Sequence, residues 1–189
     1  MKRLRFVTGI FITILIIILS TPVFAEDTDL GLTSKSAVLM ELTSGEVIYE
    51  KNPDEPRLIA STTKIMTALI VIENCDMDAV VDIKPEYTGV EGSSVYLQEG
   101  EKLTVEELLY CMLLKSGNDA ATALAYYTAG SIEAFAQLMN EKVEQLDLQN
   151  TCFENPHGLD GDNQYSSARD LALITAEAMR YDVFCEIVA

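Results

Sequence analysis

Ser61-Thr62-Thr63-Lys64, followed by the apolar run Ile65–Ile72, is the stretch of sequence that decides the fold. It places a hydroxyl and an amine three positions apart at the start of a predicted helix over 61–74, so both side chains project from one face. The amine can accept the hydroxyl proton, provided that burial or a nearby positive charge lowers the lysine pKa from its usual ~10.4. Free amides at the helix start can stabilise negative charge on an attacked carbonyl oxygen. The segment therefore predicts a nucleophile, Ser61, and its base, Lys64.

The Ser-x-x-Lys spacing alone is weak evidence, because it arises by chance about once in a chain of this length. A capped core helix explains it as well. A second motif, Ser116-Gly117-Asn118, begins 52 residues after Lys64 at the junction of two predicted helices. A tight turn there can present a hydroxyl and an amide, although a simple loop with a helix cap is the alternative.

The strand pattern predicts an α+β domain that begins with a hairpin. Apolar and β-branched runs predict strands over 37–42 and 46–49, joined by a turn at 43–45. Weaker strand signals cover 80–83 and 94–97. A lone hairpin is marginal in water, so we expect further strands to complete the sheet.

Four helices are expected after the strand signals. The first covers 105–114 and begins with a capping box of Thr104 and Glu107. The second is capped by Asn118 or Asp119 and ends near 130. The third follows a Ser131 cap, and the fourth opens at Ser167-Ala168-Arg169-Asp170.

Composition limits the class of protein. Apolar residues make up 49% and charged residues 23% of the 189 positions, which is ordinary for one globular domain and argues against disorder. The formal net charge is −17, so nucleic acid is excluded as a partner class. The same charge repels anionic polymers, so an anionic substrate group would need a local cationic site.

Residues 1–25 are predicted to be a signal peptide. Three basic residues among the first five precede an apolar run over 6–19, and small residues precede a cut after Ala25. The apolar run is shorter than the ~20 residues that span a bilayer, so an uncleaved anchor is the weaker alternative. Cleavage removes three basic residues and no acids, which takes the net charge of the mature chain, 26–189, from −17 to −20.

The cysteines are an even set, which an exported protein can pair into disulfides. Their spacing matches no zinc or redox motif, and two of them lie in apolar segments, which favours free buried thiols. The four are Cys75, Cys111, Cys152 and Cys185.

Four segments resemble, in the same order, the low-molecular-weight penicillin-binding proteins, which are serine D-Ala-D-Ala carboxypeptidases. They are Ile59–Thr67, Leu113–Ala121, Asn155–Leu159 and Ser167–Ala172. The resemblance covers nearly all of residues 34–189. It implies a β-lactamase/DD-peptidase-like fold with an antiparallel sheet against a helical block, and it makes residues 26–189 the N-terminal part of a catalytic domain.

The resemblance implies that Ser61 attacks the peptide carbonyl between the two terminal D-alanines of a peptidoglycan stem peptide and forms an acyl-enzyme. Lys64 would be the base, Ser116 would relay a proton, and Asn118 would hold the substrate's amide backbone. β-Lactam antibiotics would acylate the same serine, and no metal or organic cofactor is implied. The only histidine, His157, lies in a turn that looks structural in this family, which disfavours a Ser-His-Asp triad.

The family's third motif, Lys-Thr-Gly or Lys-Ser-Gly, is expected downstream of the fourth helix, and the match stops at Ala189 before reaching it. We therefore expect a C-terminally truncated chain that lacks the last strands of the sheet, with its activity in doubt. The missing motif would supply a cation for the substrate carboxylate, a like charge that lowers the pKa of Lys64, and an oxyanion-hole amide. Export to the cell wall or to the outer face of the cytoplasmic membrane is expected, with membrane association through a missing C-terminal segment.

Two other functions stay open. A serine β-lactamase shares the fold and the first motif but needs a carboxylate for rapid deacylation, and no Glu-x-x-Leu-Asn segment is present to supply it. A non-catalytic wall-binding or regulatory protein would keep the front half of the fold without turnover.

Overall fold

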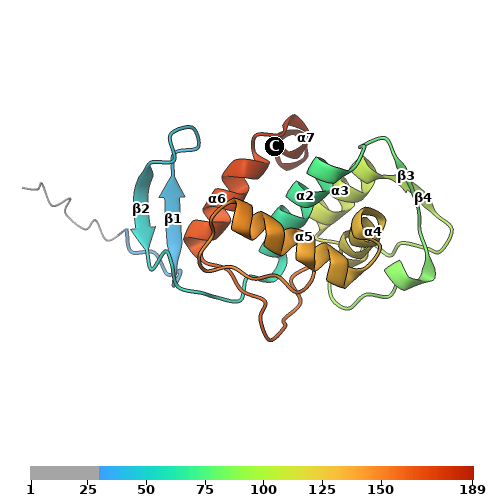
Figure 1. The fold of residues 1–189 in the computed structure, drawn as a ribbon, viewed down its shortest axis with the longest axis horizontal. Coiled ribbons are helices and arrows are strands. Elements are labelled where there is room, and N and C mark those ends of the chain that lie inside the picture. The colour runs from blue at the N-terminus through green and yellow to red at the C-terminus, as the bar shows by residue number, and fades with distance from the viewer. Residues whose placement is uncertain (1–29) are drawn as a thin grey trace, which may run out of the picture. The chain divides into compact units, whose positions relative to one another are not determined.

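The structure, a computed structural model, describes residues 30–189 (Figure 1). The predicted signal peptide over 1–25 lies outside the described residues. Every helix and strand below belongs to one compact unit, Ser34–Ala189. No helix in this described part of the chain is long and apolar enough to cross a membrane.

A buried helix, α2, forms the centre of the unit. Its residues Ala68, Leu69 and Val71 have no exposed surface. A helix with apolar residues on all its faces is stable only when it is buried in this way. α2 contacts α3, α4, α5 and α6, and Figure 1 shows it in the middle of the helical group. The bounds of these helices are Thr63–Asn74 for α2, Val105–Lys115 for α3, Asn118–Ala129 for α4, Ile132–Gln145 for α5 and Ala168–Ala178 for α6.

Three of the predicted helix starts are confirmed by their caps. Thr104 and Glu107 form the capping box of α3. The Ser131 hydroxyl accepts a hydrogen bond from Ala134 N at 3.1 Å, and the Ser167 hydroxyl accepts one from Asp170 N at 3.1 Å. Each cap satisfies a backbone amide that has no partner within its helix.

The predicted cap of α4 is wrong. Gly117, rather than Asn118 or Asp119, precedes the helix, and it provides no side-chain cap. The reason is tertiary: the side chains of Asn118 and Asp119 bond to segments far away in the sequence. Both residues are buried, so these distant hydrogen bonds decide where their side chains point.

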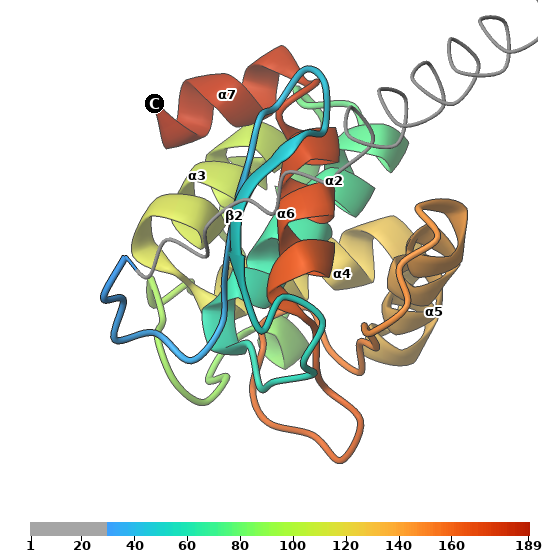
Figure 2. The same cartoon turned by 90° about the vertical axis from the view of Figure 1, so that its left-hand side faces the viewer.

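The opening hairpin is confirmed with slightly different bounds. Strand β1, Ala37–Met40, pairs antiparallel with β2, Val47–Lys51, and β1 packs against α6. In Figure 2 the hairpin crosses in front of α6. Arg169 of α6 forms ion pairs with the end of β2 and with the loop that follows it. Its guanidinium lies 2.9 Å from Glu50 and 2.6 Å from Asp54.

A second, separate strand pair lies at the far end of the helical group (Figure 1). Strand β3, Val80–Asp82, pairs antiparallel with β4, Lys102–Thr104. The weak strand signal over 80–83 is therefore confirmed, whereas β4 was not predicted. The strand expected over 94–97 is wrong: the segment is a loop, because the amides of Val95 and Leu97 donate to a buried carboxylate instead of a neighbouring strand.

The structure contains short helices that were not predicted. Two 3₁₀ turns, Ala60–Thr62 (η1) and Pro85–Tyr87 (η2), lie in loops, and α7, Asp182–Val188, packs against α3. The four cysteines are unpaired. Helices with two small antiparallel sheets agree with the predicted α+β class.

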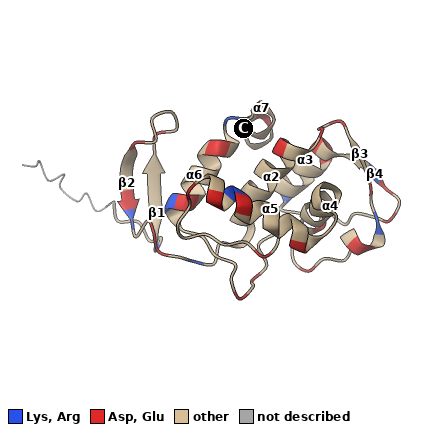
Figure 3. Ribbon diagram, viewed as in Figure 1, with Lys and Arg blue, Asp and Glu red and all other residues tan. Residues whose placement is uncertain are grey.

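Acidic positions outnumber basic ones over the described helices and strands (Figure 3). The sequence as a whole has 30 Asp and Glu against 13 Lys and Arg. Any anionic group that binds this surface must therefore meet a local cation.

Candidate active site

Ser61 and Lys64 lie where the turn η1 continues into α2. The two side chains fall on the same face, and Lys64 Nζ lies 3.2 Å from Ser61 Oγ. Ser61 is exposed, whereas Lys64 is only 2% exposed. The residue before the serine, Ala60, has a φ of 44°, a strained value for a residue with a side chain. Strain of this kind concentrates at functional sites, which supports Ser61 as the nucleophile.

The hydrogen-bond partners of Lys64 determine where its nitrogen donates and where it can accept a proton. Besides Ser61 Oγ, Nζ contacts Asn118 Oδ1 at 2.8 Å and the carbonyl oxygen of His157 at 2.9 Å. Both of these oxygens can only accept. A neutral amine has two N–H groups and one lone pair, so the N–H groups point at these acceptors and the lone pair points at the Ser61 hydroxyl. The neutral Lys64 is thereby oriented to take the serine proton.

Burial also prepares Lys64 for this role. It lowers the pKa of the Lys64 ammonium from 10.5 to about 8, because the charged form loses hydration. A general base works best when its pKa lies near the working pH.

Asn118 links Lys64 to a distant loop. It is 4% exposed and begins α4. While Oδ1 accepts from Lys64, Nδ2 donates to the carbonyl oxygen of Glu91 at 2.7 Å, and its backbone amide donates to Ser93 at 2.7 Å. These bonds fix both the amide orientation of Asn118 and the position of the loop beside Ser61.

Ser116 ends α3 in the left-handed conformation, with a φ of 57°. It lines the same cavity as Ser61 and Lys64. Its side chain forms no hydrogen bond to other residues of the described chain, so its role as a proton relay stays a prediction. The left-handed backbone, which is costly for serine, presents this hydroxyl at the junction of α3 and α4.

The turn Asn155–Leu159 contributes a functional atom that the sequence did not reveal. The His157 carbonyl oxygen accepts a hydrogen bond from Lys64, whereas its ring Nδ1 accepts one from the Leu159 amide rather than from the serine. Burial, together with the nearby Lys64 charge, lowers the pKa of His157 to about 4, so the ring is neutral at pH 7. Every residue type has a backbone carbonyl, so the residue types of this turn could not indicate the contact with Lys64.

Two cavities meet at Ser61. The first, which we call the apolar cavity, has a volume of about 460 Å³ and is lined by Lys64, Ser116 and Thr175 together with Met179 and apolar residues of α2, α3 and α7. The second, which we call the polar cavity, has a volume of about 620 Å³ and is lined by Ala60, Asn118 and the segments 91–93 and 157–160. A substrate attacked by Ser61 can therefore extend in two directions of different chemistry.

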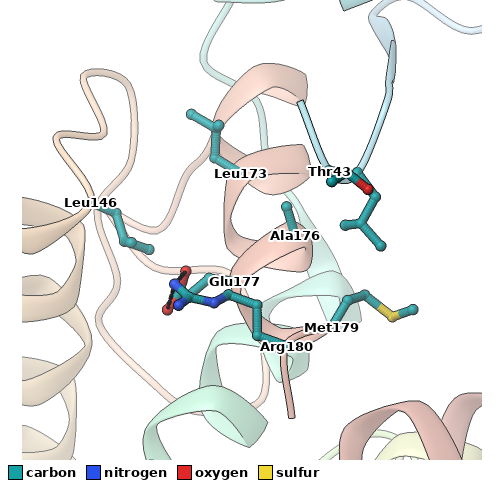
Figure 4. Close-up of a pocket in the computed structure, with 8 residues that line it drawn as sticks. Thr43, Leu146, Leu173, Ala176, Glu177, Met179 and Arg180 are labelled. Carbon is teal, nitrogen blue, oxygen red and sulfur yellow. Dashed lines mark hydrogen bonds and ion pairs between the residues drawn. The ribbon is translucent and has the colours of Figure 1, made fainter. Parts of the chain in front are cut away.

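A third cavity lies away from this chemistry, between the hairpin turn and α6 (Figure 4). Its lining includes Leu42 and Thr43 of the hairpin turn, Leu173 and Ala176 of α6, and the ion pair of Glu177 and Arg180, at 2.9 Å. Its lining contains no nucleophile paired with a base. Within residues 30–189, no group of three His, Cys, Asp or Glu side chains is placed to hold a metal ion.

Asp119 holds the loop that forms one wall of the site. Its carboxylate is 1% exposed and accepts hydrogen bonds from Ser94 Oγ at 2.6 Å and from the amides of Val95 and Leu97 at 3.1 and 3.0 Å. Burial alone would raise the pKa of Asp119, but these hydrogen bonds outweigh it and hold the pKa below its usual 3.8. The stabilisation is therefore present at neutral pH and is lost as the pH falls through the lowered pKa.

Asp119→Asn is expected to destabilise the protein by about 2–3 kcal/mol at pH 7, because an amide offers one acceptor oxygen where the carboxylate offers two. Urea unfolding measures the loss, and hydrogen exchange at the amides of Val95 and Leu97 should accelerate. Asp82→Asn, which removes an exposed carboxylate paired with Lys102, should cost below about 1 kcal/mol. Equal effects of the two substitutions would contradict this role of Asp119.

Comparisons with known proteins agree on one family. The family model of peptidase S11, D-alanyl-D-alanine carboxypeptidase, matches residues 23–187. The carboxypeptidase DacF of Bacillus subtilis is 38% identical over 192 residues, covering 96% of this chain and 49% of its own. DacA of Escherichia coli is 39% identical over 160 residues, covering 78% of this chain and 39% of its own.

Solved structures give the same result. The carboxypeptidase DacD from Francisella tularensis matches with a TM-score of 0.78 and 36% identity, over 89% of this chain and 41% of that one. A mutant of the Streptomyces K15 DD-transpeptidase matches with a TM-score of 0.79 and 34% identity, over 82% of this chain and 65% of that one. The predicted DD-peptidase fold is therefore confirmed, and the chain spans about half the length of the curated relatives that it matches.

Proposed function

This chain belongs to the D-alanyl-D-alanine carboxypeptidase family, peptidase S11, and we propose that it removes the terminal D-alanine of peptidoglycan stem peptides through an acyl-enzyme on Ser61. The observation that carries the proposal is the orientation of Lys64, whose two other partners can only accept. That arrangement leaves the nitrogen lone pair for the serine hydroxyl, at 3.2 Å. Family membership and local geometry thus support the same nucleophile and base.

In the proposed acylation, the lone pair of neutral Lys64 takes the Ser61 proton while Oγ bonds to the carbonyl carbon of the penultimate D-alanine. The resulting tetrahedral oxyanion collapses, the peptide C–N bond breaks, and the leaving D-alanine nitrogen takes a proton. Ser116, on the wall of the apolar cavity, would pass that proton from Lys64 to the leaving nitrogen. Water then hydrolyses the ester and regenerates Ser61.

Asn118 is proposed to hold the substrate's amide backbone. One hydrogen of its Nδ2 group is used by the Glu91 carbonyl oxygen, and the second has no acceptor within the described chain. Because Asn118 is buried and lines the polar cavity, that second hydrogen is available to a substrate carbonyl. The amide thus orients the base through Oδ1 and binds the substrate through Nδ2.

The signal-peptide pattern supports export, and the proposed substrate lies outside the cytoplasm. We propose that the protein works in the cell wall or on the outer face of the cytoplasmic membrane, where β-lactams would acylate Ser61 as substrate mimics. Membrane association, which the family resemblance implies, is also part of this proposal.

The test is to incubate the purified protein with a fluorescent penicillin and with diacetyl-L-Lys-D-Ala-D-Ala. Formation of a long-lived adduct on Ser61, located by mass spectrometry, and release of free D-alanine would support a carboxypeptidase. Rapid hydrolysis of the penicillin would instead indicate a β-lactamase. Wall binding that Ser61→Ala leaves unchanged, without an adduct or D-alanine release, would indicate a non-catalytic protein.

The pH dependence of acylation follows from the pKa of Lys64, about 8. The neutral amine is the base, so the acylation rate should rise with pH and level off above about pH 8. At pH 7 about one tenth of Lys64 is neutral, and at pH 6 about one hundredth, so each unit below the pKa should slow acylation about tenfold. Stopped-flow labelling with penicillin measures the profile. A rate that is constant between pH 6 and 8 would exclude Lys64 as the base.

A further inference from the structure

Gln164 joins the start of α2 to the turn Asn155–Leu159 through one buried side chain. It is 2% exposed, and its Oε1 atom accepts from the backbone amides of Glu154 at 2.6 Å and Asn155 at 3.3 Å. Its Nε2 atom donates to Thr63 Oγ1 at 3.0 Å. Thr63 is fully buried and lies between the nucleophile and the base in the sequence. A single carboxamide thus connects the catalytic end of α2 with a segment about 100 positions away.

The chemistry of its partners fixes the orientation of the Gln164 carboxamide. Two backbone N–H groups can bond only to an acceptor, so Oε1 faces the turn and Nε2 faces α2. The amide nitrogen can only donate, so the hydroxyl oxygen of Thr63 accepts. The backbone beside Gln164 is fixed as well, because Tyr165 exchanges two backbone hydrogen bonds with Cys152, at 2.9 and 3.1 Å. Gln164 is therefore a link with one arrangement that satisfies all three of these partners.

The turn that Gln164 holds is the turn that orients the base. Its His157 carbonyl oxygen accepts from Lys64 Nζ at 2.9 Å. One helical turn beyond Thr63, the hydroxyl of Thr67 donates to the Pro156 carbonyl oxygen at 2.6 Å. Residues three and four positions apart lie on the same face of a helix. The turn is thus tied to one face of α2 at three points, namely Thr63, Lys64 and Thr67.

Two properties of Lys64 depend on the position of this turn. The His157 carbonyl oxygen takes one N–H group of the neutral amine, which leaves the lone pair directed at the Ser61 hydroxyl. Contact with the turn also helps to bury Lys64, and burial is the cause that lowers its pKa to about 8. A displacement of the turn by about 1 Å would therefore redirect the N–H groups and admit water to the amine.

From these contacts, and resting on the proposed function, we propose that Gln164 is a positioning residue for the acylation step. Its carboxamide holds the His157 carbonyl oxygen against Lys64 by fastening the turn Asn155–Leu159 to α2. Gln164 does not line either of the cavities that meet at Ser61. It acts through the base, so its effect belongs to the rate and the pH dependence of acylation.

The first variant is Gln164→Met, which keeps an unbranched side chain of similar length and removes both the donor and the acceptor. Labelling of Ser61 by a fluorescent penicillin is followed by stopped flow between pH 6 and 10. We expect the plateau rate to fall about 100-fold, since a misplacement of about 1 Å has that effect. The midpoint of the profile should rise by about one pH unit from the Lys64 pKa of about 8, because hydration favours the ammonium form.

The pH profile reports on Lys64 because the other titratable groups near it are accounted for. The pKa of His157 is about 4 and that of Asp119 is held below 3.8, so neither group titrates between pH 6 and 10. The two carboxylates that line the polar cavity, Glu91 and Asp160, are the same in every variant. A change in the midpoint between variants is therefore a change at Lys64.

Asn140→Leu is the matched control, because Asn140 of α5 holds the same segment without a link to α2. Its side chain accepts from Phe153 N at 3.0 Å and donates to the Phe153 carbonyl oxygen at 2.8 Å. Like Gln164→Met, it should lower the urea midpoint of unfolding, yet it should keep the plateau rate and the pH midpoint of the unmodified protein. Equal changes of rate and pH midpoint in the two variants would overturn the proposal, because loosening of the segment would then explain both.

A second pair of variants keeps the test decisive if Gln164→Met does not fold. Thr63→Val removes the acceptor for Gln164 Nε2 and leaves the bonds of Gln164 to the turn in place, whereas Thr63→Ser keeps the hydroxyl. We expect Thr63→Val to slow the plateau rate about tenfold and to raise the pH midpoint, and Thr63→Ser to restore both. A folded Thr63→Val with the unmodified rate and midpoint would contradict the proposal.

The unmodified protein separates this inference from the proposed function. Labelling of Ser61 in the unmodified protein, with the same rate and pH midpoint in Gln164→Met, would overturn the inference and leave the proposed function standing. Absence of labelling and of D-alanine release in the unmodified protein would overturn the proposed function itself, and the inference with it.

Discussion

Lys64→Met is expected to slow acylation of Ser61 by a penicillin about 10²- to 10⁴-fold, the usual contribution of a general base. Methionine fills the buried space but has no lone pair of suitable basicity. The two acceptors that now bind Lys64 would also lose their donor, so Asn118 could rotate and the His157 carbonyl would be left unsatisfied. Stopped-flow labelling at pH 8 measures the rate, and urea unfolding measures the accompanying loss of stability.

Two further variants separate base catalysis from positive charge. Lys64→Arg keeps a cation and its hydrogen bonds but stays protonated at every accessible pH, so it should not restore the rate. Lys102→Met removes an exposed lysine paired with Asp82, and it should label at the unmodified rate. Restoration of the rate by arginine would contradict proton abstraction and would indicate that Lys64 acts through its charge.

Gly158→Ala is expected to be the most damaging single-methyl substitution near the site. Gly158 has a φ of 87°, and an added Cβ would overlap the carbonyl group of Ala60 and lie 2.9 Å from Thr63 Oγ1. Ala60 and Thr63 flank the nucleophile on either side, so relief of the overlap must move η1 or the Asn155–Leu159 turn. We expect a loss of more than about 3 kcal/mol in the free energy of unfolding.

The same substitution should also slow acylation about 100-fold, since a misplacement of about 1 Å has that effect. Gly130→Ala is the matched control, because Gly130 has a φ of 82° but nothing within 4 Å of the added Cβ. It should lose about 1 kcal/mol through backbone strain and keep the acylation rate. Similar losses in both variants would show that conformation, rather than contact with Ala60, explains the effect at Gly158.

The sequence was sufficient for features that depend on neighbours along the chain. The spacing of Ser61 and Lys64 places them on one helical face, and the structure finds them 3.2 Å apart. Local side chains likewise determined the caps at Thr104, Ser131 and Ser167, because the donor and the acceptor lie three residues apart. Strand β3 was indicated by its pattern, but its partner β4 was not, since only pairing across the loop makes three residues a strand.

Tertiary structure alone decided where the side chains of buried polar residues point. The sequence suggested Asn118 and Asp119 as helix caps, yet each forms hydrogen bonds with residues 22 or more positions away. These partners are Lys64 and the loop 91–97. The same hydrogen bonds prevented the strand expected over 94–97. A buried polar group must be satisfied wherever a partner exists, so long-range contacts override local preference.

Two properties of the site were not available from residue types. The His157 carbonyl orients Lys64, and a carbonyl has the same chemistry in every residue. The polar cavity gathers Glu91 and Asp160, 69 positions apart in the chain, beside Ser61. The sequence thus determined the candidates for nucleophile and base and the helical framework, because periodicity and spacing are local. The orientation of the base and the charge of the cavity required the fold, because both arise from atoms that only folding brings together.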